Sequence, residues 1–415
     1  MIPAVVRLHA MVPEKTTRRE ALRLAAGSLA AGTAVSLSGC TSALPPLGSQ
    51  LDFGRVDVPD ADDPAYRQWL PAPARIADDR HHYDVLVRRP TALDYTAPVR
   101  FVVPKKSLLT DLDYVGVGYA NYDRLLSTPF GVVLEGQFDA ATVTATLADT
   151  GYARDGAFHE YDLFTRADDP RTVAVRDGTV VYANERRHEA ADVRALVDAE
   201  AGRIDRYHEA EDRFARASAA IGESRMVEFL RPNDARSWLK AEGFRFDGDT
   251  AYHVVTHLYP DGEAVPTDRL KQRSVQKTLL TREVDAFHYE ERGQRATVAG
   301  RIPPGEGLDP ATEPYPPHAT WGGAVDPDAG TATLRHEAGE PVDPSNLRFE
   351  LRSPDGTVGE DGTPWTGADS VRPGDTTTVP SNGAASADVA ASTLQYTAEG
   401  ASYGSLFTIE TEGDG

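Results

Sequence analysis

The sequence predicts an α+β protein whose C-terminal region is built from strands. Three observations lead to this fold class. Between residues 82 and 305, apolar residues alternate in short strand-like runs and recur at helical spacing in longer ones. A Pro- and Gly-rich break covers residues 306–320. In residues 321–415, turn residues recur roughly every ten positions, a pattern typical of a small β-sandwich.

The pattern of residues 82–203 predicts one unit that contains both helices and strands. Asp139 is placed to cap a helix running through Leu147, and Asp177-Gly178 fits a hairpin turn. A second helix is expected over 190–200 and ends before Gly202. The order of strand, helix, hairpin and helix predicts a ferredoxin-like α+β unit. We expect strands at 83–88, 99–103, 114–119, 131–136, 161–165, 172–175 and 180–183.

Residues 204–305 form a second α+β stretch with a similar order of elements. The similarity predicts either a separate domain or a second copy of the first unit, packed on it through the sheets. A hairpin closed by Arg292-Gly293 ends the stretch. We expect helices at 205–221, 234–240 and 267–280, and strands at 225–230, 251–258, 284–290 and 294–302.

The C-terminal residues 321–415 contain predicted strands and resemble a known β-domain. Strands are expected at 329–336, 347–352, 394–397 and 405–410. The run from Thr331 to Leu347, which includes His336-Glu337-Ala338-Gly339-Glu340, together with Val371-Arg372-Pro373-Gly374-Asp375, resembles the Ig-like β-domain of archaeal type IV pilin-type exported proteins. The resemblance implies an extracellular adhesive or spacer module without catalytic residues. This domain lacks the hydrophobic assembly helix of pilins, so filament assembly is not implied.

The charge composition disfavours some classes of binding partner. The chain has 415 residues, a net charge of −21, and only six lysines among its 43 basic residues. Such an acidic, lysine-poor composition resembles proteins of halophilic archaea, in which hydrated carboxylates maintain solubility where salt screens charge. A nucleic-acid partner is disfavoured because phosphate contacts need a basic face. Anionic lipid headgroups would also repel most of this surface.

The N-terminal residues 1–40 have the layout of an export signal. Arg18 and Arg19, with Leu22 three residues later, precede an Ala- and Gly-rich apolar run and resemble a twin-arginine signal. The run is too short to predict a membrane-spanning helix. Met11 stands at the usual distance before the arginine pair, so we expect translation to begin there.

Cys40 is the only cysteine, which excludes an internal disulfide and a Cys-based metal site. It ends Leu37-Ser38-Gly39-Cys40, which resembles a lipobox. We therefore expect Cys40 to be lipidated and to hold the protein at the extracytoplasmic face of the cell membrane, although a cysteine buried in an Ala-rich helix has the same local sequence. Residues 41–81 are expected to be a linker, within which Tyr66 and Trp69 predict a short segment docked on the body.

Sites for chemistry are sparse in the sequence. No nucleophile, nucleotide or calcium-loop motif occurs, so the sequence predicts no cofactor and no enzyme. Gly116-Val117-Gly118 lacks a third glycine and is interpreted as part of a strand. His253 and His257 are expected to share one strand face and are weak candidates for metal ligands.

Three functions are compatible with these patterns. The first is a non-catalytic, lipid-anchored surface protein with a binding or envelope-organising role. The second is a solute- or metal-binding lipoprotein that uses a cleft between the two α+β units, with His253 and His257 as ligands. The third is an exported hydrolase with a non-standard site.

Overall fold

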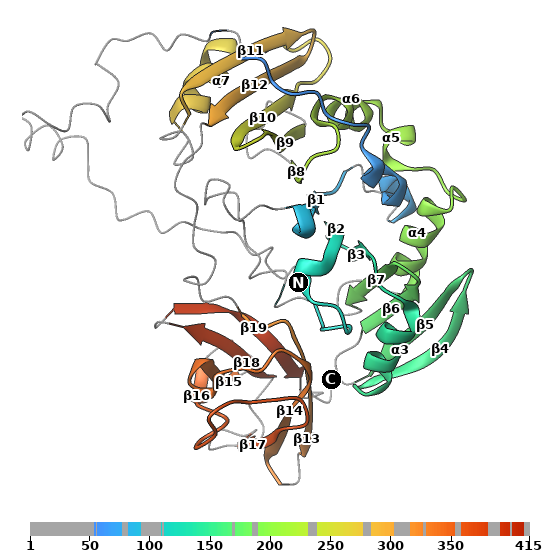
Figure 1. The fold of residues 1–415 in the computed structure, drawn as a ribbon, viewed down its shortest axis with the longest axis vertical. Coiled ribbons are helices and arrows are strands. Elements are labelled where there is room, and N and C mark those ends of the chain that lie inside the picture. Colours follow the sequence, from blue (N-terminus) through green and yellow to red (C-terminus); the bar gives the residue numbers. More distant parts are fainter. Residues whose placement is uncertain are drawn as a thin grey trace, which may run out of the picture. The chain divides into compact units, whose positions relative to one another are not determined.

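The structure is a computed structural model (Figure 1). The chain divides into two units, residues 1–51 and 52–415. The first unit, which holds the predicted export signal and Cys40, lies outside the described residues, as does the predicted strand 99–103. The structure describes residues 54, 56–76, 82–92, 109, 112–167, 171–184, 190–230, 239–276, 284–302, 316–326, 329–352, 358–380, 391–398 and 401–410.

Within the described residues, twelve strands form one antiparallel sheet (Figure 1). The strands are β1 (Val85–Arg88), β2 (Tyr122–Thr128), β3 (Gly131–Gly136), β4 (Tyr152–Phe158), β5 (Tyr161–Arg166), β6 (Arg171–Arg176), β7 (Thr179–Asn184), β8 (Met226–Leu230), β9 (Leu239–Asp247), β10 (Thr250–Leu258), β11 (Ala286–Arg292) and β12 (Arg295–Ile302). Their order across the sheet is β11-β12-β10-β9-β8-β1-β2-β3-β7-β6-β5-β4.

The predicted ferredoxin-like α+β fold is wrong. The described chain is mostly β, and the stretches 82–203 and 204–305 are halves of one sheet. Strands β1 and β8 join the halves in the register Val85↔Phe229 to Arg88↔Met226. Because the sheet is continuous there, the two stretches are not separate units with a binding cleft between them.

Helices cover both faces of this sheet. They are α3 (Ala140–Ala148), α4 (Ala190–Glu200), α5 (Tyr207–Ala210), α6 (Asp212–Ile221) and α7 (Thr267–Gln276), with short 3-10 helices η1 (Ala65–Trp69), η2 (Pro73–Arg75), η3 (Pro90–Ala92) and η5 (Tyr119–Asn121). None of the described helices combines the length and apolar character needed to cross a bilayer.

The two faces have different cores. Face A, which carries α4, α5, α6 and η1, holds a large cluster that includes Leu196, Phe214 and Trp69. Face B holds the cluster around α3 and smaller clusters toward α7. Arg88 lies between two of the face B clusters. In the strand register it stands opposite Leu125 of β2 on one side and opposite Met226 of β8 on the other.

The two halves share one order of elements. Each opens with a three-stranded meander, β1-β2-β3 or β8-β9-β10, followed by a helix, α3 or α7. Antiparallel strands then return, and the last of them pairs with the third meander strand, as β7 does with β3 and β12 with β10. The internal repeat is therefore one of sheet halves rather than of ferredoxin-like units.

Two local expectations fail for backbone reasons. Residues 114–119 do not form a strand, because Gly116 has φ +86° and a Cβ there would lie 2.5 Å from Thr146 Oγ1 of α3. The expected helix 205–221 is broken into α5 and α6, because Glu211 between them is extended at φ −126° and ψ 98°.

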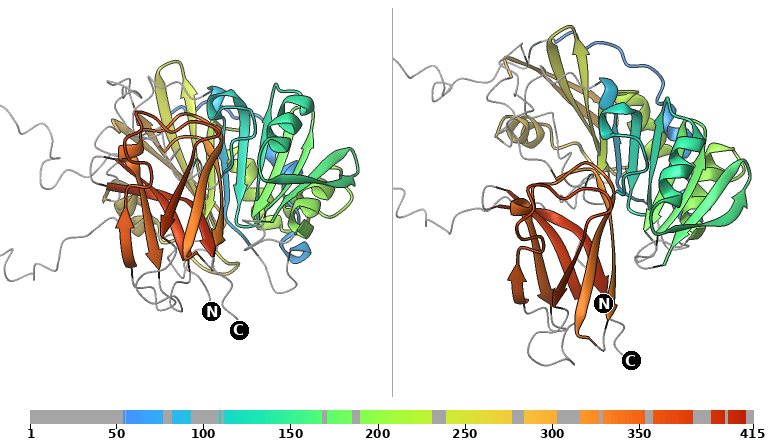
Figure 2. Two further views of the ribbon diagram at one scale, coloured as in Figure 1. Left: turned by 90° about the horizontal axis from the view of Figure 1, so that it is seen from below. Right: turned by 60° about the horizontal axis from the view of Figure 1, so that its bottom comes forward.

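The C-terminal residues form two antiparallel sheets, drawn in orange and red in Figure 2. One has the order β13-β14-β17 and the other β16-β15-β18-β19. Residues from both sheets, including Trp321 and Leu394, belong to a single hydrophobic cluster. The strands are β13 (Ala319–Asp326), β14 (Thr331–Gly339), β15 (Leu347–Arg352), β16 (Val358–Gly362), β17 (Thr376–Pro380), β18 (Ala391–Ala398) and β19 (Ala401–Glu410), and η8 (Pro344–Asn346) precedes β15.

Candidate functional site

Residues 56–76, which we call the strap, lie across face A and bind to elements of both sheet halves. The Gly54 carbonyl, just before the strap, lies 3.3 Å from His288 Nδ1 of β11. Further along, Arg245 of β9 donates to the Pro59 carbonyl at 2.7 Å, and the Glu223 amide donates to that of Asp62 at 2.7 Å. In Figure 1 the blue segment runs from β11 past α6 toward α4.

Gly222 allows the strap to approach closely. It ends α6 with φ +69°, a conformation that side-chain-bearing residues rarely adopt. A Cβ at this position would lie 2.5 Å from Ala61 Cβ and 2.9 Å from the Asp62 carbonyl oxygen of the strap. The glycine therefore allows α6 to end and also allows the strap to pack against that end.

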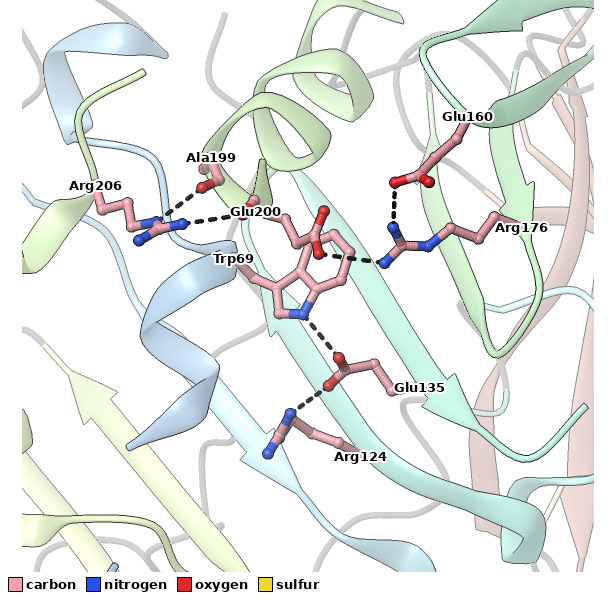
Figure 3. Close-up of polar contacts among 8 residues, drawn as sticks. All are labelled: Trp69, Arg124, Glu135, Glu160, Arg176, Ala199, Glu200 and Arg206. Carbon is pink, nitrogen blue, oxygen red and sulfur yellow. Dashed lines mark hydrogen bonds and ion pairs between the residues drawn. The ribbon is translucent and has the colours of Figure 1, made fainter. Parts of the chain in front are cut away.

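Trp69 fixes the middle of the strap through packing and a hydrogen bond. Its side chain is fully buried, as is that of Tyr66 one turn earlier, which confirms the predicted docking of these two residues. The indole Nε1 donates to Glu135 Oε1 of β3 at 3.0 Å (Figure 3). A buried indole N–H needs such an acceptor, so the contact combines hydrophobic burial with a specific orientation.

Arg124 of β2 extends this contact into a network. It binds the second oxygen of Glu135 and also Glu223, whose Oε1 lies 3.0 Å from Arg124 Nη2. Glu223 Oε2 in turn accepts from the Ala65 amide at 2.9 Å, which returns the network to the strap. Burial alone would lower the pKa of Arg124, but the two carboxylates outweigh it and raise the pKa.

A second arginine holds the C-terminal end of the strap. The Arg206 guanidinium donates to the carbonyls of Ala199 and Glu200, at 2.8 and 2.9 Å, and so caps α4 (Figure 3). Arg206 also forms an isolated β-bridge with Pro71 of the strap. Beside it, Arg176 binds the side chains of Glu160 and Glu200. Arg206 therefore joins the end of α4 to the strap, and Arg176 joins β6 to α4.

Face B carries a separate ion cluster at the centre of the sheet. Arg88 Nη2 lies 2.5 Å from Glu228 Oε1, and Lys240 Nζ lies 2.7 Å from Glu242 Oε2. His253 Nε2 lies 3.4 Å from the same Glu242 oxygen, and its ring stacks on Phe244 at 4.5 Å between centroids. Sequence reasoning identified only His253 among these residues, because its partners come from neighbouring strands.

Glu242 is the most strongly perturbed carboxylate of this cluster. Burial would raise its pKa, but the hydrogen bond from His253 and the positive charge of Lys240 outweigh burial and lower the pKa well below the usual range. The folded state therefore stabilises the charged carboxylate.

The pH dependence of stability should reveal this pairing. Because the folded pKa of Glu242 is depressed well below its ordinary value of 4.5, its contribution is fully present above that pH and is lost progressively as the pH falls from there through the folded pKa. Glu242→Gln should therefore destabilise the protein most at about pH 6 and clearly less at about pH 2.5, as measured by urea unfolding. Asp249→Asn, an exposed turn residue, makes the same charge change and is the control. An equal loss for Glu242→Gln at both pH values would contradict the pairing.

The predicted site residues have different outcomes. His253 and His257 do lie on one face of β10, but His253 contacts Glu242, and His257 stacks toward Tyr259 with 6.5 Å between ring centroids. In the described part of the chain, no three His, Cys, Asp or Glu side chains are grouped to hold a metal ion. Arg18, Arg19, Leu22, Leu37, Ser38, Gly39 and Cys40 lie outside the described residues.

Comparisons with known proteins add little. Neither protein-family models nor curated proteins match the chain. Among solved structures, crystal form III of TP0453 aligns with a TM-score of 0.35 and 9% identity over 59% of this chain and 95% of that one. Crystal form I aligns with a TM-score of 0.34 and 9% identity over 57% and 92%. These similarities are too weak to support an inference about fold or function.

Proposed function

We propose that this protein is a non-catalytic, lipid-anchored surface protein on the extracytoplasmic face of the cell membrane, where it serves in binding or envelope organisation. The observation that carries the proposal is the solitary Cys40, which ends a lipobox-like run after an export signal. The acidic composition suits a body exposed to salt.

The strap supports this function from the structural side. The first described residue after Cys40 is Gly54, and the chain then binds both halves of the sheet before it reaches β1. A pull on Cys40 would act along the strap and be shared by the contacts of Asp62, Ala65 and Trp69. These contacts suit the strap to connect the proposed anchor to the sheet.

Substitution of Cys40 tests the anchor directly. The wild-type protein should remain in the membrane fraction after a high-salt wash, and Cys40→Ser should move to the soluble extracytoplasmic fraction because it lacks the acyl or alkyl chains. The matched control, Arg18→Lys with Arg19→Lys, should leave an uncut precursor inside the cell. Retention of salt-washed Cys40→Ser in the membrane at the wild-type level would refute the anchor.

A further inference from the structure

His336 lies inside the C-terminal pair of sheets, on β14. Its exposed fraction is 0%, and it stands opposite Trp321 of β13 in the strand register. The imidazole stacks on the Trp321 indole with 4.6 Å between ring centroids, and the Trp365 ring lies 5.7 Å from the same indole. Within the described residues, neither ring nitrogen of His336 forms a hydrogen bond. An ionisable ring thus occupies a buried position where an apolar aromatic ring could also stack.

Residues 363–375, which we call the clasp, are joined to β14 at His336. The His336 amide donates to the Asp375 carbonyl at 3.0 Å, and the Gly374 amide donates to the His336 carbonyl at 2.7 Å. Three residues of the clasp are buried, namely Pro364, Trp365 and Val371. A segment with so few buried residues opens at a lower free energy than the core of a sheet.

A positive charge on the His336 ring would be poorly compensated. Burial lowers the pKa of this ring, although nearby backbone groups and the charge of Asp375 favour its protonated form. Arg335 and Glu337, the neighbours on β14, lie on the opposite face of the strand, as the alternation of burial shows. Arg372 of the clasp is exposed. Among the described residues around the ring, Asp375 is therefore the charged group that favours the imidazolium.

We propose that His336 is an acid-sensitive switch, in which protonation of the ring releases the clasp from β14. A buried charge without a paired partner is unfavourable, and opening of the clasp lets water reach the imidazolium. Release also exposes Trp365 and the apolar surface beneath it, so the surface of this domain changes with the pH of the medium. The switch goes beyond the proposed function and does not depend on the anchor.

The direction of the pH effect follows from the two states of the ring. A solvated histidine has a pKa of about 6.5, so the open form binds the proton more tightly than the closed form. The clasp is therefore most stable above that pH. Opening becomes more favourable as the pH falls from there through the folded pKa, by at most about tenfold per pH unit. Most carboxylates stay ionised above about pH 5, so they contribute little to this change.

Fluorine NMR of the full-length protein labelled with 5-fluorotryptophan tests the switch, with signals assigned by single Trp→Phe variants. Between about pH 8 and pH 5, the Trp321 and Trp365 signals should change with a midpoint below about 6.5. The signal of Trp69, which lies in the strap, should stay unchanged and is the internal control. Trp321 and Trp365 signals that do not change over this range would overturn the proposal.

Two variants show whether His336 is the group that takes the proton. His336→Phe keeps a ring that can stack on Trp321 but cannot be protonated, so its tryptophan signals should not respond to pH. The matched control, His288→Phe on β11, should retain the wild-type response. A response retained in His336→Phe would refute the assignment.

Asp375→Asn tests the assignment if His336→Phe does not fold. This variant removes the charge that favours the imidazolium but keeps an oxygen that can accept from the Arg372 amide, a hydrogen bond of 2.8 Å. The midpoint should move to lower pH by about 0.2–0.7 pH units, the shift expected for an exposed charge pair. A midpoint that stayed at the wild-type value or rose would contradict the switch.

Discussion

Replacing Trp69 with alanine is expected to lower the free energy of unfolding by about 3–5 kcal/mol, as large-to-small changes of buried aromatic residues do. The side chain is fully buried between the strap and face A, beside the cluster of Leu70, Leu196 and Leu126. The substitution also removes the donor to Glu135 Oε1 and leaves that oxygen without its indole partner. Urea or thermal unfolding followed by circular dichroism measures the loss.

The conservative variant separates packing from hydrogen bonding. Trp69→Phe keeps most of the buried apolar volume but lacks the N–H, so its loss should be well below that of Trp69→Ala. Because the strap binds both halves of the sheet, Trp69→Ala should also make residues 56–76 more accessible to limited proteolysis. If Trp69→Ala unfolded at the wild-type denaturant concentration, the strap would not be an integral part of the fold.

Sequence patterns were informative where the structure depends on local interactions. The Asp139 cap was predicted, and its side chain accepts from the Thr142 amide at 2.7 Å. The bounds expected for the helix 190–200 and the turn at Asp177-Gly178 are confirmed. Each of these features depends on residues a few positions apart, which one sequence displays directly.

The sheet itself depends on information that one sequence does not display. Strands β1 and β8 pair although roughly 140 residues separate them, and no periodicity indicates a partner at that distance. Strand β4 is exposed over most of its length, so it lacks the apolar alternation of a half-buried strand. The first residues of β9 were assigned to an expected helix over 234–240, which removed one strand from the second half.

The face B site shows the same limit. His253 stood out because histidine is a common ligand, but its partner Glu242 is one of 64 acidic residues. Because acidic residues are so common in this chain, a carboxylate in the sequence does not by itself indicate a site. Only the strand register shows which carboxylate lies opposite a cation. Arg88 was predicted only as the last residue of a strand, and its contact with Glu228 spans 140 positions.

Removal of the Arg88 charge should cause the second large loss of unfolding free energy. Arg88 is nearly buried, with 3% of its side chain exposed, and Glu228 is 20% exposed. Burial lowers the pKa of Arg88, and the carboxylate of Glu228 opposes that effect. Arg88→Met leaves Glu228 without its cation and is expected to cost about 3–5 kcal/mol of unfolding free energy, the range for breaking a buried pair on one side.

The double variant distinguishes an ion pair from simple packing. Arg88→Met with Glu228→Gln removes both charges, so it should recover a large part of the stability that Arg88→Met loses. Arg75→Met is the matched control, because Arg75 and Asp205 lie 2.7 Å apart but are 51% and 66% exposed, and an exposed pair contributes less than about 1 kcal/mol. No recovery in the double variant would mean that Arg88 acts through its contacts with the Val87 and Val227 carbonyls. In that case the centre of the sheet would depend on backbone hydrogen bonds rather than on paired charge.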